Sequence, residues 1–328
     1  MVANVFSKIK TKLVRVLRIL QFITESYQDI WLFLRHNGFS PFESIGRRLS
    51  HKTIIEAHTI EKGLALPNPR PYFGVGKING LLDMNENWSP PDGDLSRSML
   101  IAALRDYQEA FRHLPVPNVV LFNRINTFLS DKDVNGAVGG SRKGIFRASE
   151  ANFAAITFLQ SRFSVREFDS KQISEEELFK IVTLAQRAPS QCNRQSSRLH
   201  IYRDRSKIDQ LLALQGGARG FSDQVPNLFV VTSEITAWGG PQQRNQPYVD
   251  GGIYATMLLL SLDALGFVSC PLNLAISNRT ERTIKAIGEI PSRERLIVMV
   301  AAGYPPDHMI SAAQSPRWPA NAIYKLHD

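Results

Sequence analysis

The sequence has only two cysteines and no long apolar run. Cys192 and Cys270 lie far apart among the 328 residues, so they form neither a disulfide framework nor a closely spaced metal-binding pair. A chain without a disulfide framework suits a reducing compartment, and we expect a cytoplasmic protein. No apolar stretch reaches the roughly 18 to 20 residues that a transmembrane helix needs, so no membrane span is expected.

Acidic residues are scarce in the first 52 positions. This segment holds nine Lys and Arg residues but only three Asp and Glu residues, so +6 of the chain's net charge of +9 lies there. Nucleic-acid binding needs basic residues along a whole binding face. The localised charge argues against a nucleic-acid partner and favours a local surface partner.

Residues 5–34 are expected to form one amphipathic helix. On a helical wheel its apolar residues fall along one stripe, whereas Lys and Arg residues occupy the rest of the circumference. The stripe consists of Val5, Ile9, Leu13, Val16, Leu20, Ile23, Tyr27, Ile30 and Leu34. A basic amphipathic helix is typical of peripheral contact with an anionic membrane surface. The alternative is that the stripe packs on the body of the protein or on a partner subunit.

The rest of residues 1–145 is also expected to be helical. Apolar periodicity and proline breaks indicate helices at 44–64, 95–113 and 118–129, and the glycine-rich and charged segment 131–144 reads as a linker. The segment 85–93 is turn-rich. This region reveals no chemical role.

Two features of this helical region resemble ligand sites only weakly. His51 and His58 share a helix face, but zinc ligands on one helix normally lie three or four residues apart, so no metal is expected. The glycines of 74–80 match neither the dinucleotide nor the P-loop spacing, and no β-rich segment precedes them.

From residue 146 to 328 the pattern changes to mixed helices and strands. A capping box formed by Ser174 and Glu177 marks the start of one helix. The mixture predicts an α+β domain. The expected helices are 149–161, 174–187, 206–214, 247–265 and 279–287, and the expected strands are 199–202, 228–232 and 296–300.

A phosphate-binding group is predicted where the apolar run 154–159 ends. Arg162 and Arg166 place two guanidinium groups four residues apart, with the hydroxyl of Ser164 midway between them. Guanidinium forks bind phosphate oxygens in pairs, so this segment could hold a phosphate monoester without a glycine-rich loop. The alternative is a solvated surface, or ion pairs with neighbours such as Glu167 and Asp169.

Two later loops carry further polar groups. In 188–195 a proline ends a helix, and the amide of Asn193 can donate and accept hydrogen bonds at the edge of a flat heterocycle. In 266–273 backbone groups could approach a ligand closely. Cys270 has no histidine nearby in sequence to activate it, which favours a buried apolar role. Arg317 precedes a proline near the C-terminus.

Over about residues 150–320 these motifs resemble the nitroreductase-like FMN oxidoreductase family. The resemblance rests on Arg162-x-Ser164-x-Arg166, on Pro189-Ser190-x-x-Asn193-x-Gln195, on Gly266 through Asn273 and on the late arginine, in the family's order. The chain further resembles one branch of that family, whose members look like enzymes of polysaccharide gene clusters. Its stretches here are 216–221, 244–246, Asp250-Gly251-Gly252 and Cys270-Pro271-Leu272-Asn273.

The resemblance implies a nitroreductase-like FMN-binding fold with a central mixed sheet flanked by helices, preceded by an all-helical N-terminal domain. It implies a homodimer with FMN at the interface, and a ping-pong transfer of hydride from NAD(P)H through flavin N5 to a small-molecule acceptor. No side chain is expected to act as a catalytic nucleophile. The implied cofactor-binding residues are Arg162, Phe163, Ser164, Arg166, Pro189, Ser190, Gln191, Asn193, Pro271, Leu272, Asn273 and Arg317, with Pro189 to Asn193 reaching the flavin of the other subunit.

Two departures from the branch pattern affect this expectation. Ala218 replaces an asparagine, which removes a polar flavin contact, and Ser196-Ser197-Arg198 replaces an aromatic neighbourhood. They motivate a second hypothesis, that the chain is a non-catalytic assembly or membrane-surface protein that keeps the flavoprotein fold.

Overall fold

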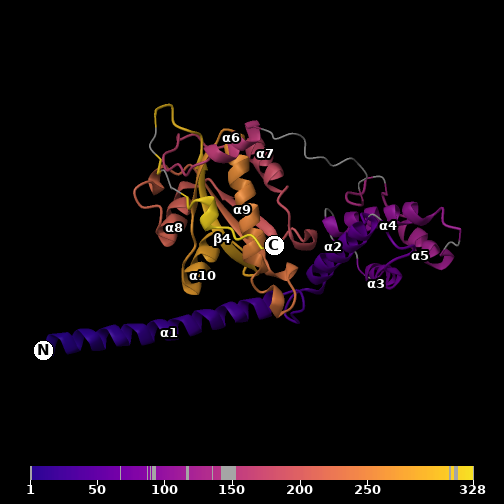
Figure 1. The fold of residues 1–328 in the computed structure, drawn as a ribbon, viewed down its shortest axis with the longest axis horizontal. Coiled ribbons are helices and arrows are strands. Elements are labelled where there is room, and N and C mark those ends of the chain that lie inside the picture. Colours follow the sequence, from indigo (N-terminus) through magenta and orange to yellow (C-terminus); the bar gives the residue numbers. More distant parts are fainter. Residues whose placement is uncertain are drawn as a thin grey trace.

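The computed structural model describes residues 2–66, 68–86, 88, 90, 94–115, 118–134, 136–141, 153–309, 312–313 and 317–327, and the side chains from residue 13 onward. A long first helix runs past an α+β body, and a cluster of helices lies at the other end (Figure 1). The α+β class and the helical N-terminal region are therefore confirmed. The expected domain boundary near residue 145 lies outside the described residues.

In the described part of the chain, five helices precede the body, and four of them are the predicted ones. They are α1 (Val2–His36), α2 (Ile45–Leu64), α3 (Val75–Glu86), α4 (Leu95–Phe111) and α5 (Val119–Leu129). The helix α3 was not predicted, because its glycines suggested a loop. Gly74 takes a left-handed φ of 71° just before α3, and Gly76 and Gly80 lie within it where nothing would contact an added Cβ. Buried Ile78, Leu81 and Leu82 anchor the helix.

The helices α2 to α5 share a hydrophobic core of their own. Tyr107 and Leu104 of α4 are fully buried there with Ile78 of α3 and Ile125 of α5. The Tyr107 hydroxyl donates to the Phe73 carbonyl at 2.8 Å, which satisfies its one polar atom. This core holds α2 as a rigid element at the edge of the body.

The body contains a four-stranded sheet in the order β1-β2-β4-β3. Its strands are β1 (Ser197–Tyr202), β2 (Asn227–Glu234), β3 (Val268–Leu272) and β4 (Glu294–Gly303), and its helices are α6 (Phe153–Ser161), α7 (Glu175–Ala185), α8 (Arg205–Gln215), α9 (Gln246–Ala264) and α10 (Asn278–Ile287). All three pairings among the described strands are antiparallel, whereas a mixed sheet was expected. The strand β3 was missed because it contains Pro271, which an edge strand tolerates.

Helices cover both faces of the sheet, so β2 is buried along its whole length. Leu228 and Val230 point into one core with residues of α8 and α10, whereas Phe229 and Val231 point into a second core with α7 and α9. This alternation follows the two-residue period of a strand. The predicted capping box is present, with Ser174 and Glu177 bonded reciprocally at the start of α7.

The Asp-Gly-Gly motif has a packing role in α9. A Cβ added to Gly251 would lie 2.6 Å from the Ile297 side chain on β4, so glycine lets the helix approach the sheet. We expect Gly251→Ala to lower the free energy of unfolding by about 1 to 3 kcal/mol through overpacking. Nothing lies within 4 Å of a Cβ added to Gly252, so Gly252→Ala should stabilise slightly. Urea denaturation of both variants tests this, and equal losses would refute it.

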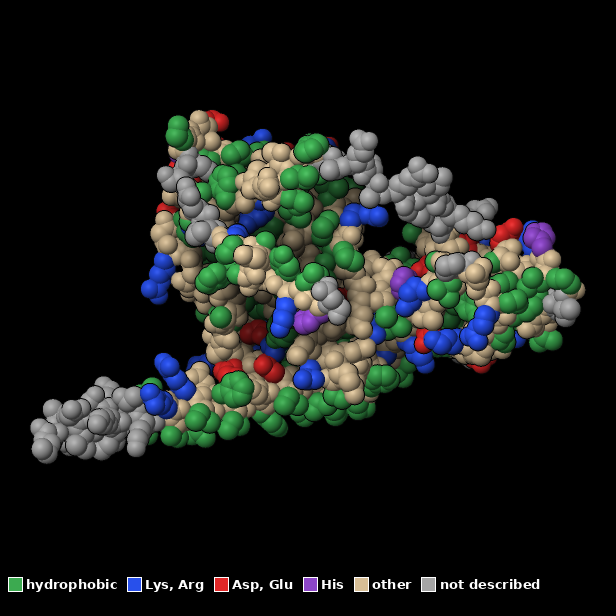
Figure 2. Space-filling model, viewed as in Figure 1, with side chains coloured by type: hydrophobic (Ala, Val, Ile, Leu, Met, Phe, Trp, Pro, Cys, Tyr) green, Lys and Arg blue, Asp and Glu red, His purple; other side chains and the backbone are tan. Residues whose placement is uncertain are grey.

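The helix α1 contacts the body along one face only. The Glu25 carboxylate accepts hydrogen bonds from the Asn278 backbone N–H (2.7 Å) and side-chain amide (2.8 Å) at the start of α10, and Asp29 pairs with Arg295. Hydrophobic side chains line the edge of α1 that faces away from the body (Figure 2). Of the stripe residues whose side chains are described, Leu13 to Tyr27 are exposed, whereas Ile30 and Leu34 line a pocket together with residues of the body such as Ile235 and Tyr248. Within the described residues, no helix is both long and apolar enough to cross a membrane.

Candidate active site

The predicted phosphate-binding segment lies beside the edge strand β3. The Val165 backbone N–H donates to the Ser269 carbonyl at 2.9 Å, and the side chains of Val165 and Phe168 are buried. Arg162 and Ser164 are partly buried, whereas Arg166 is exposed. The structure therefore brings the 162–166 segment together with the predicted loop at 266–273.

Among the described residues, the two guanidinium groups of this segment form no ion pair with a carboxylate, although the charge of Arg162 acts on Asp263 and opposes the rise that burial causes in the pKa of that carboxyl group. Glu167 contacts His308 at 2.6 Å, and Asp169 accepts the Lys171 backbone N–H at 2.7 Å. Within the described part of the chain, neither Arg162 nor Arg166 makes an ion pair. The Nη1 atom of Arg162 is buried and finds no hydrogen-bond partner among the residues that the structure describes. A buried unpaired guanidinium nitrogen is costly, and a bound anion would satisfy it.

Cys270 lies between this segment and the core. It is 2% exposed, and burial raises the pKa of its thiol, although the charges of Arg166 and Arg162 act in the opposite direction. A thiol with a raised pKa carries little thiolate at neutral pH. The structure therefore places Cys270 as a buried side chain, and we still expect it to have no nucleophilic role.

The second predicted loop has an unusual backbone. Cys192, Asn193 and Gln195 all adopt left-handed φ angles between 50° and 53°, although none is glycine. Such conformations cost free energy and persist only where surrounding contacts fix them. The Gln195 backbone N–H donates to the Ser190 hydroxyl at 3.0 Å, which closes the loop on itself.

Two buried charged residues fix this loop. The Asp250 carboxylate at the start of α9 accepts the Gln191 backbone N–H at 2.9 Å, and burial raises the pKa of Asp250. Arg194 is 7% exposed and donates to the Ala237 carbonyl at 2.6 Å and to Gln243 at 2.8 Å. Burial lowers the pKa of Arg194. The loop is therefore held in its strained shape from both sides.

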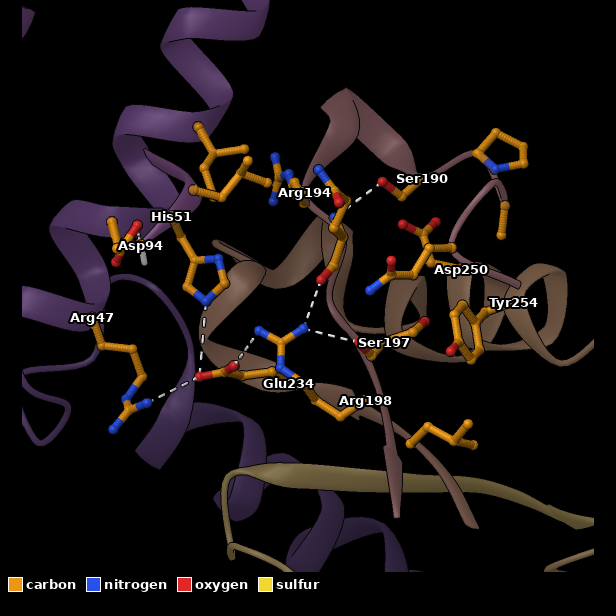
Figure 3. Close-up of a pocket in the computed structure, with 18 of the residues that line it drawn as sticks. Arg47, His51, Asp94, Ser190, Arg194, Ser197, Arg198, Glu234, Asp250 and Tyr254 are labelled. Atoms are coloured by element: carbon orange, nitrogen blue, oxygen red, sulfur yellow. Dashed lines mark hydrogen bonds and ion pairs between the residues drawn. The ribbon is translucent and has the colours of Figure 1, made fainter. Parts of the chain in front are cut away.

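A pocket of about 870 Å³ separates this loop from the helical N-terminal region (Figure 3). Its volume falls in the range of small-molecule sites. The helix α2 forms one wall and the segment 188–199 with the start of α9 forms the other. Lining residues include Arg47, His51, Trp88, Asp94, Pro189, Ser190, Arg194, Arg198, Glu234, Asp250 and Tyr254.

Glu234 is the carboxylate around which four basic side chains gather at this pocket. It is 4% exposed, and its carboxylate lies 2.9 Å from Arg198, 3.4 Å from Arg47, 3.4 Å from Arg293 and 3.8 Å from His51. Burial alone would raise the pKa of Glu234, but His51 and the arginines outweigh it and lower the pKa to about 2. Glu234 therefore stays ionised and joins α2 to the sheet.

Comparison with known proteins supports the family suggested by the sequence. The model described as "Nitroreductase family" matches residues 159–218, which include both the arginine pair and the strained loop. A protein of Archaeoglobus fulgidus named "Putative NADH dehydrogenase/NAD(P)H nitroreductase" is 26% identical over 156 residues, which cover 46% of this chain and 86% of that protein. The second half of this chain is therefore similar in sequence to nitroreductases.

Several solved structures are similar to about half of this chain. An FMN-dependent nitroreductase from Clostridium difficile is 20% identical with a TM-score of 0.45, and the alignment covers 53% of this chain and 99% of that one. A nitroreductase-like protein from Streptococcus mutans is 17% identical with a TM-score of 0.48, covering 54% and 98%.

The remaining predicted residues of the nitroreductase-like half lie around these two places. Leu272 is buried and Pro271 partly buried in β3, and the Asn273 carbonyl accepts from Gln215 at 2.8 Å. Phe163 is 48% exposed, and Arg317 is also exposed. Pro189 and Ser190 line the pocket, whereas the 162–166 segment and Arg317 do not. Within one chain the two predicted groups therefore do not form a single cavity.

Sequence reasoning missed the residues that complete the pocket. Arg47 and His51 come from the helical region, and Arg198 and Glu234 come from two strands, so no local motif connects them. Ala218, expected to leave a gap in flavin contacts, is 1% exposed in the hydrophobic core beside α8. Its methyl group therefore packs among apolar side chains.

Proposed function

We propose that the protein is an FMN-dependent oxidoreductase that uses NAD(P)H and reduces a small-molecule acceptor. The observation that carries this proposal is the pair Arg162 and Arg166, which lies beside β3 without carboxylate partners in the described chain. Two unneutralised guanidinium groups beside a hydroxyl fit a phosphate monoester such as that of FMN. The sequence similarity to nitroreductases supports the redox class.

The residues present fit the cofactor. Arg162, Ser164 and Arg166 would hold its phosphate and sugar chain, with Arg317 as a further cation, and the backbone of Pro271 to Asn273 would supply dipoles near the ring system. When bound, FMN supplies the two-electron chemistry by accepting hydride from NAD(P)H and passing it on in a ping-pong cycle. The protein binds, orients and shields the reactants.

We also propose that the site is shared by two copies of the chain, in the cytoplasm. The helix α6 has no buried residue, and Phe153 is 79% and Leu159 61% exposed. The C-terminal segment exposes Trp318, Ile323 and Leu326 in the same way. Exposed apolar groups of this size favour coverage by a partner. A partner copy would also bring a strained loop to the arginine pair, which one chain alone does not do.

The pocket between α2 and the strained loop is the proposed acceptor site. His51 is 7% exposed, and its Nδ1 atom has no hydrogen-bond partner among the described residues. Depending on the tautomer, Nδ1 could donate a hydrogen bond to a ligand carbonyl or nitro oxygen, or accept one from a ligand N–H. Three arginines line the pocket, but so do three carboxylates. The internal balance of charge favours an uncharged, flat acceptor.

This charge balance gives a prediction about substrates. We expect nitrobenzene to be reduced with a kcat/KM at least about tenfold higher than 4-nitrobenzoate, because a carboxylate entering the pocket finds Arg47 and Arg198 already paired with Glu234. Steady-state assays with both compounds at the same NADH concentration measure this. A preference for the benzoate would contradict the proposed neutral pocket.

The direct test of the function is anaerobic mixing of the FMN-loaded protein with NADH or NADPH. Bleaching of the flavin absorption, followed by recovery when a nitroaromatic acceptor is added, is the expected result. Bound flavin that neither nicotinamide reduces would overturn the enzymatic proposal and favour a non-catalytic assembly protein.

A further inference from the structure

A second cavity lies between the end of α1 and the segment that leads into α9, and it shares none of its described lining residues with the proposed acceptor site. Its volume of about 780 Å³ falls in the range of small-molecule sites. Lining residues between 29 and 41 form one wall, and lining residues between 235 and 248, together with Arg295, form the other. Figure 1 shows the last turns of α1 beside the orange segment before α9. The cavity is therefore a groove between α1 and the body.

Apolar side chains line both walls of this groove. Ile235 is 2% exposed and Pro247 is buried, so they lie at its inner side. Leu34 and Phe39 are 55% and 77% exposed and lie at its mouth. A ligand must enter between the two walls to reach the inner residues, which a flat surface cannot do. The groove therefore suits an apolar ligand that is narrow enough to enter it, such as a hydrocarbon chain.

Two polar side chains of the α1 wall are already occupied by the backbone. The Asn37 amide donates to the Phe33 carbonyl at 2.8 Å, and its oxygen accepts the Phe39 backbone N–H at 2.9 Å. The Ser40 hydroxyl donates to the Arg35 carbonyl at 2.6 Å. Both side chains therefore close the end of α1 and have little capacity left to bind a ligand with many polar groups.

Arg244 is a cation of the groove that forms no ion pair within the described chain. Its guanidinium donates a hydrogen bond to the Pro241 carbonyl at 3.1 Å. The other arginine of the groove, Arg295, is paired with Asp29, which also lines it. Arg244 therefore gives the groove an excess positive charge, which an anionic ligand group would neutralise. It also begins the 244–246 motif, which the proposed flavin site does not use.

We propose that this groove binds a single-chain amphiphile, such as a fatty acid, with its hydrocarbon chain between the two walls and its anionic head group on Arg244. Burial of the chain against Ile235 and Leu34 supplies most of the affinity, because these contacts remove hydrocarbon from water. The guanidinium binds a carboxylate through two parallel hydrogen bonds, so it selects an acid over a neutral amphiphile of the same length.

Isothermal titration calorimetry of the full-length protein with decanoate, at concentrations below micelle formation, tests the site. We expect saturable binding of one decanoate per chain, and binding of decanol at least about tenfold weaker because decanol lacks the charge. Arg244→Gln should reduce decanoate affinity about tenfold and leave decanol affinity unchanged. Leu34→Glu should weaken the binding of both compounds, because it places a carboxylate at the apolar mouth of the groove.

Two matched substitutions outside the groove are the controls. Leu20→Glu changes an exposed residue of the same α1 stripe, and Arg219→Gln removes an exposed arginine that, like Arg244, forms no ion pair in the described chain. Both variants should bind decanoate as the wild type does. The proposal is overturned by the absence of saturable decanoate binding, by equal affinities for decanoate and decanol, or by a loss in either control as large as in its groove counterpart.

Discussion

If the protein binds FMN as proposed, we expect Arg166→Ala to weaken FMN binding by about 10- to 150-fold. The lost charge-assisted hydrogen bonds to phosphate are worth roughly 1.5 to 3 kcal/mol, and in the described structure no carboxylate pairs with Arg166. The FMN affinity of Arg166→Lys should lie between those of the wild type and Arg166→Ala, because lysine keeps the positive charge but cannot bind phosphate with two parallel hydrogen bonds. Fluorescence titration of the apoprotein with FMN measures all three dissociation constants.

Arg112→Ala is the matched control for this experiment. Arg112 is an exposed arginine that pairs with Glu109 on α4, away from the 162–166 segment. Its removal should leave FMN affinity unchanged. If Arg166→Ala and Arg112→Ala bind FMN as the wild type does, the phosphate-binding role of the arginine pair is wrong.

We expect Glu234→Gln to lower the free energy of unfolding at pH 7 by about 3 to 5 kcal/mol. The carboxylate is buried among Arg47, Arg198, Arg293 and His51, and its removal leaves those groups without their shared partner. Two of the four come from α2, so the substitution should also loosen the helical region from the sheet. Urea denaturation monitored by circular dichroism measures the loss.

The same variant has a predicted pH dependence. The folded-state pKa of Glu234, about 2, lies below its ordinary value of 4.5, so its contribution is fully present above about pH 4.5 and is lost as pH falls toward 2. The difference between wild type and Glu234→Gln should therefore shrink between pH 5 and pH 3. The control is Glu289→Gln, which removes an exposed pair with Lys207 and should cost less than about 1 kcal/mol. Equal losses of unfolding free energy in Glu234→Gln and Glu289→Gln would contradict the proposed stabilising role of Glu234.

Local patterns in the sequence predicted most of the secondary structure. Apolar periodicity located α1, α2, α4 and α5 in the N-terminal region, and the capping box at Ser174 located the start of α7. These signals work because each lies within one element. The prediction failed at α3, because its glycines argued against a helix, and at β3, because Pro271 argued against a strand.

The site was predictable only in part, for a physical reason. Arg162, Ser164 and Arg166 form a motif because they are neighbours in one segment, and the structure places that segment beside β3. The pocket depends on contacts across the fold. Glu234 and Arg47 are 187 residues apart, and neither residue alone indicates a site. The left-handed backbone of Cys192 and Asn193 likewise arises from tertiary contacts.

The most direct test of the central claim is a titration of the purified full-length apoprotein with FMN, followed by flavin fluorescence and analytical ultracentrifugation. The account predicts saturable binding of one FMN per chain, with the flavin sedimenting with an assembly of more than one copy. If the protein binds no FMN, or binds riboflavin, which lacks the phosphate, as tightly as FMN, the proposal that Arg162 and Arg166 bind a phosphate is wrong.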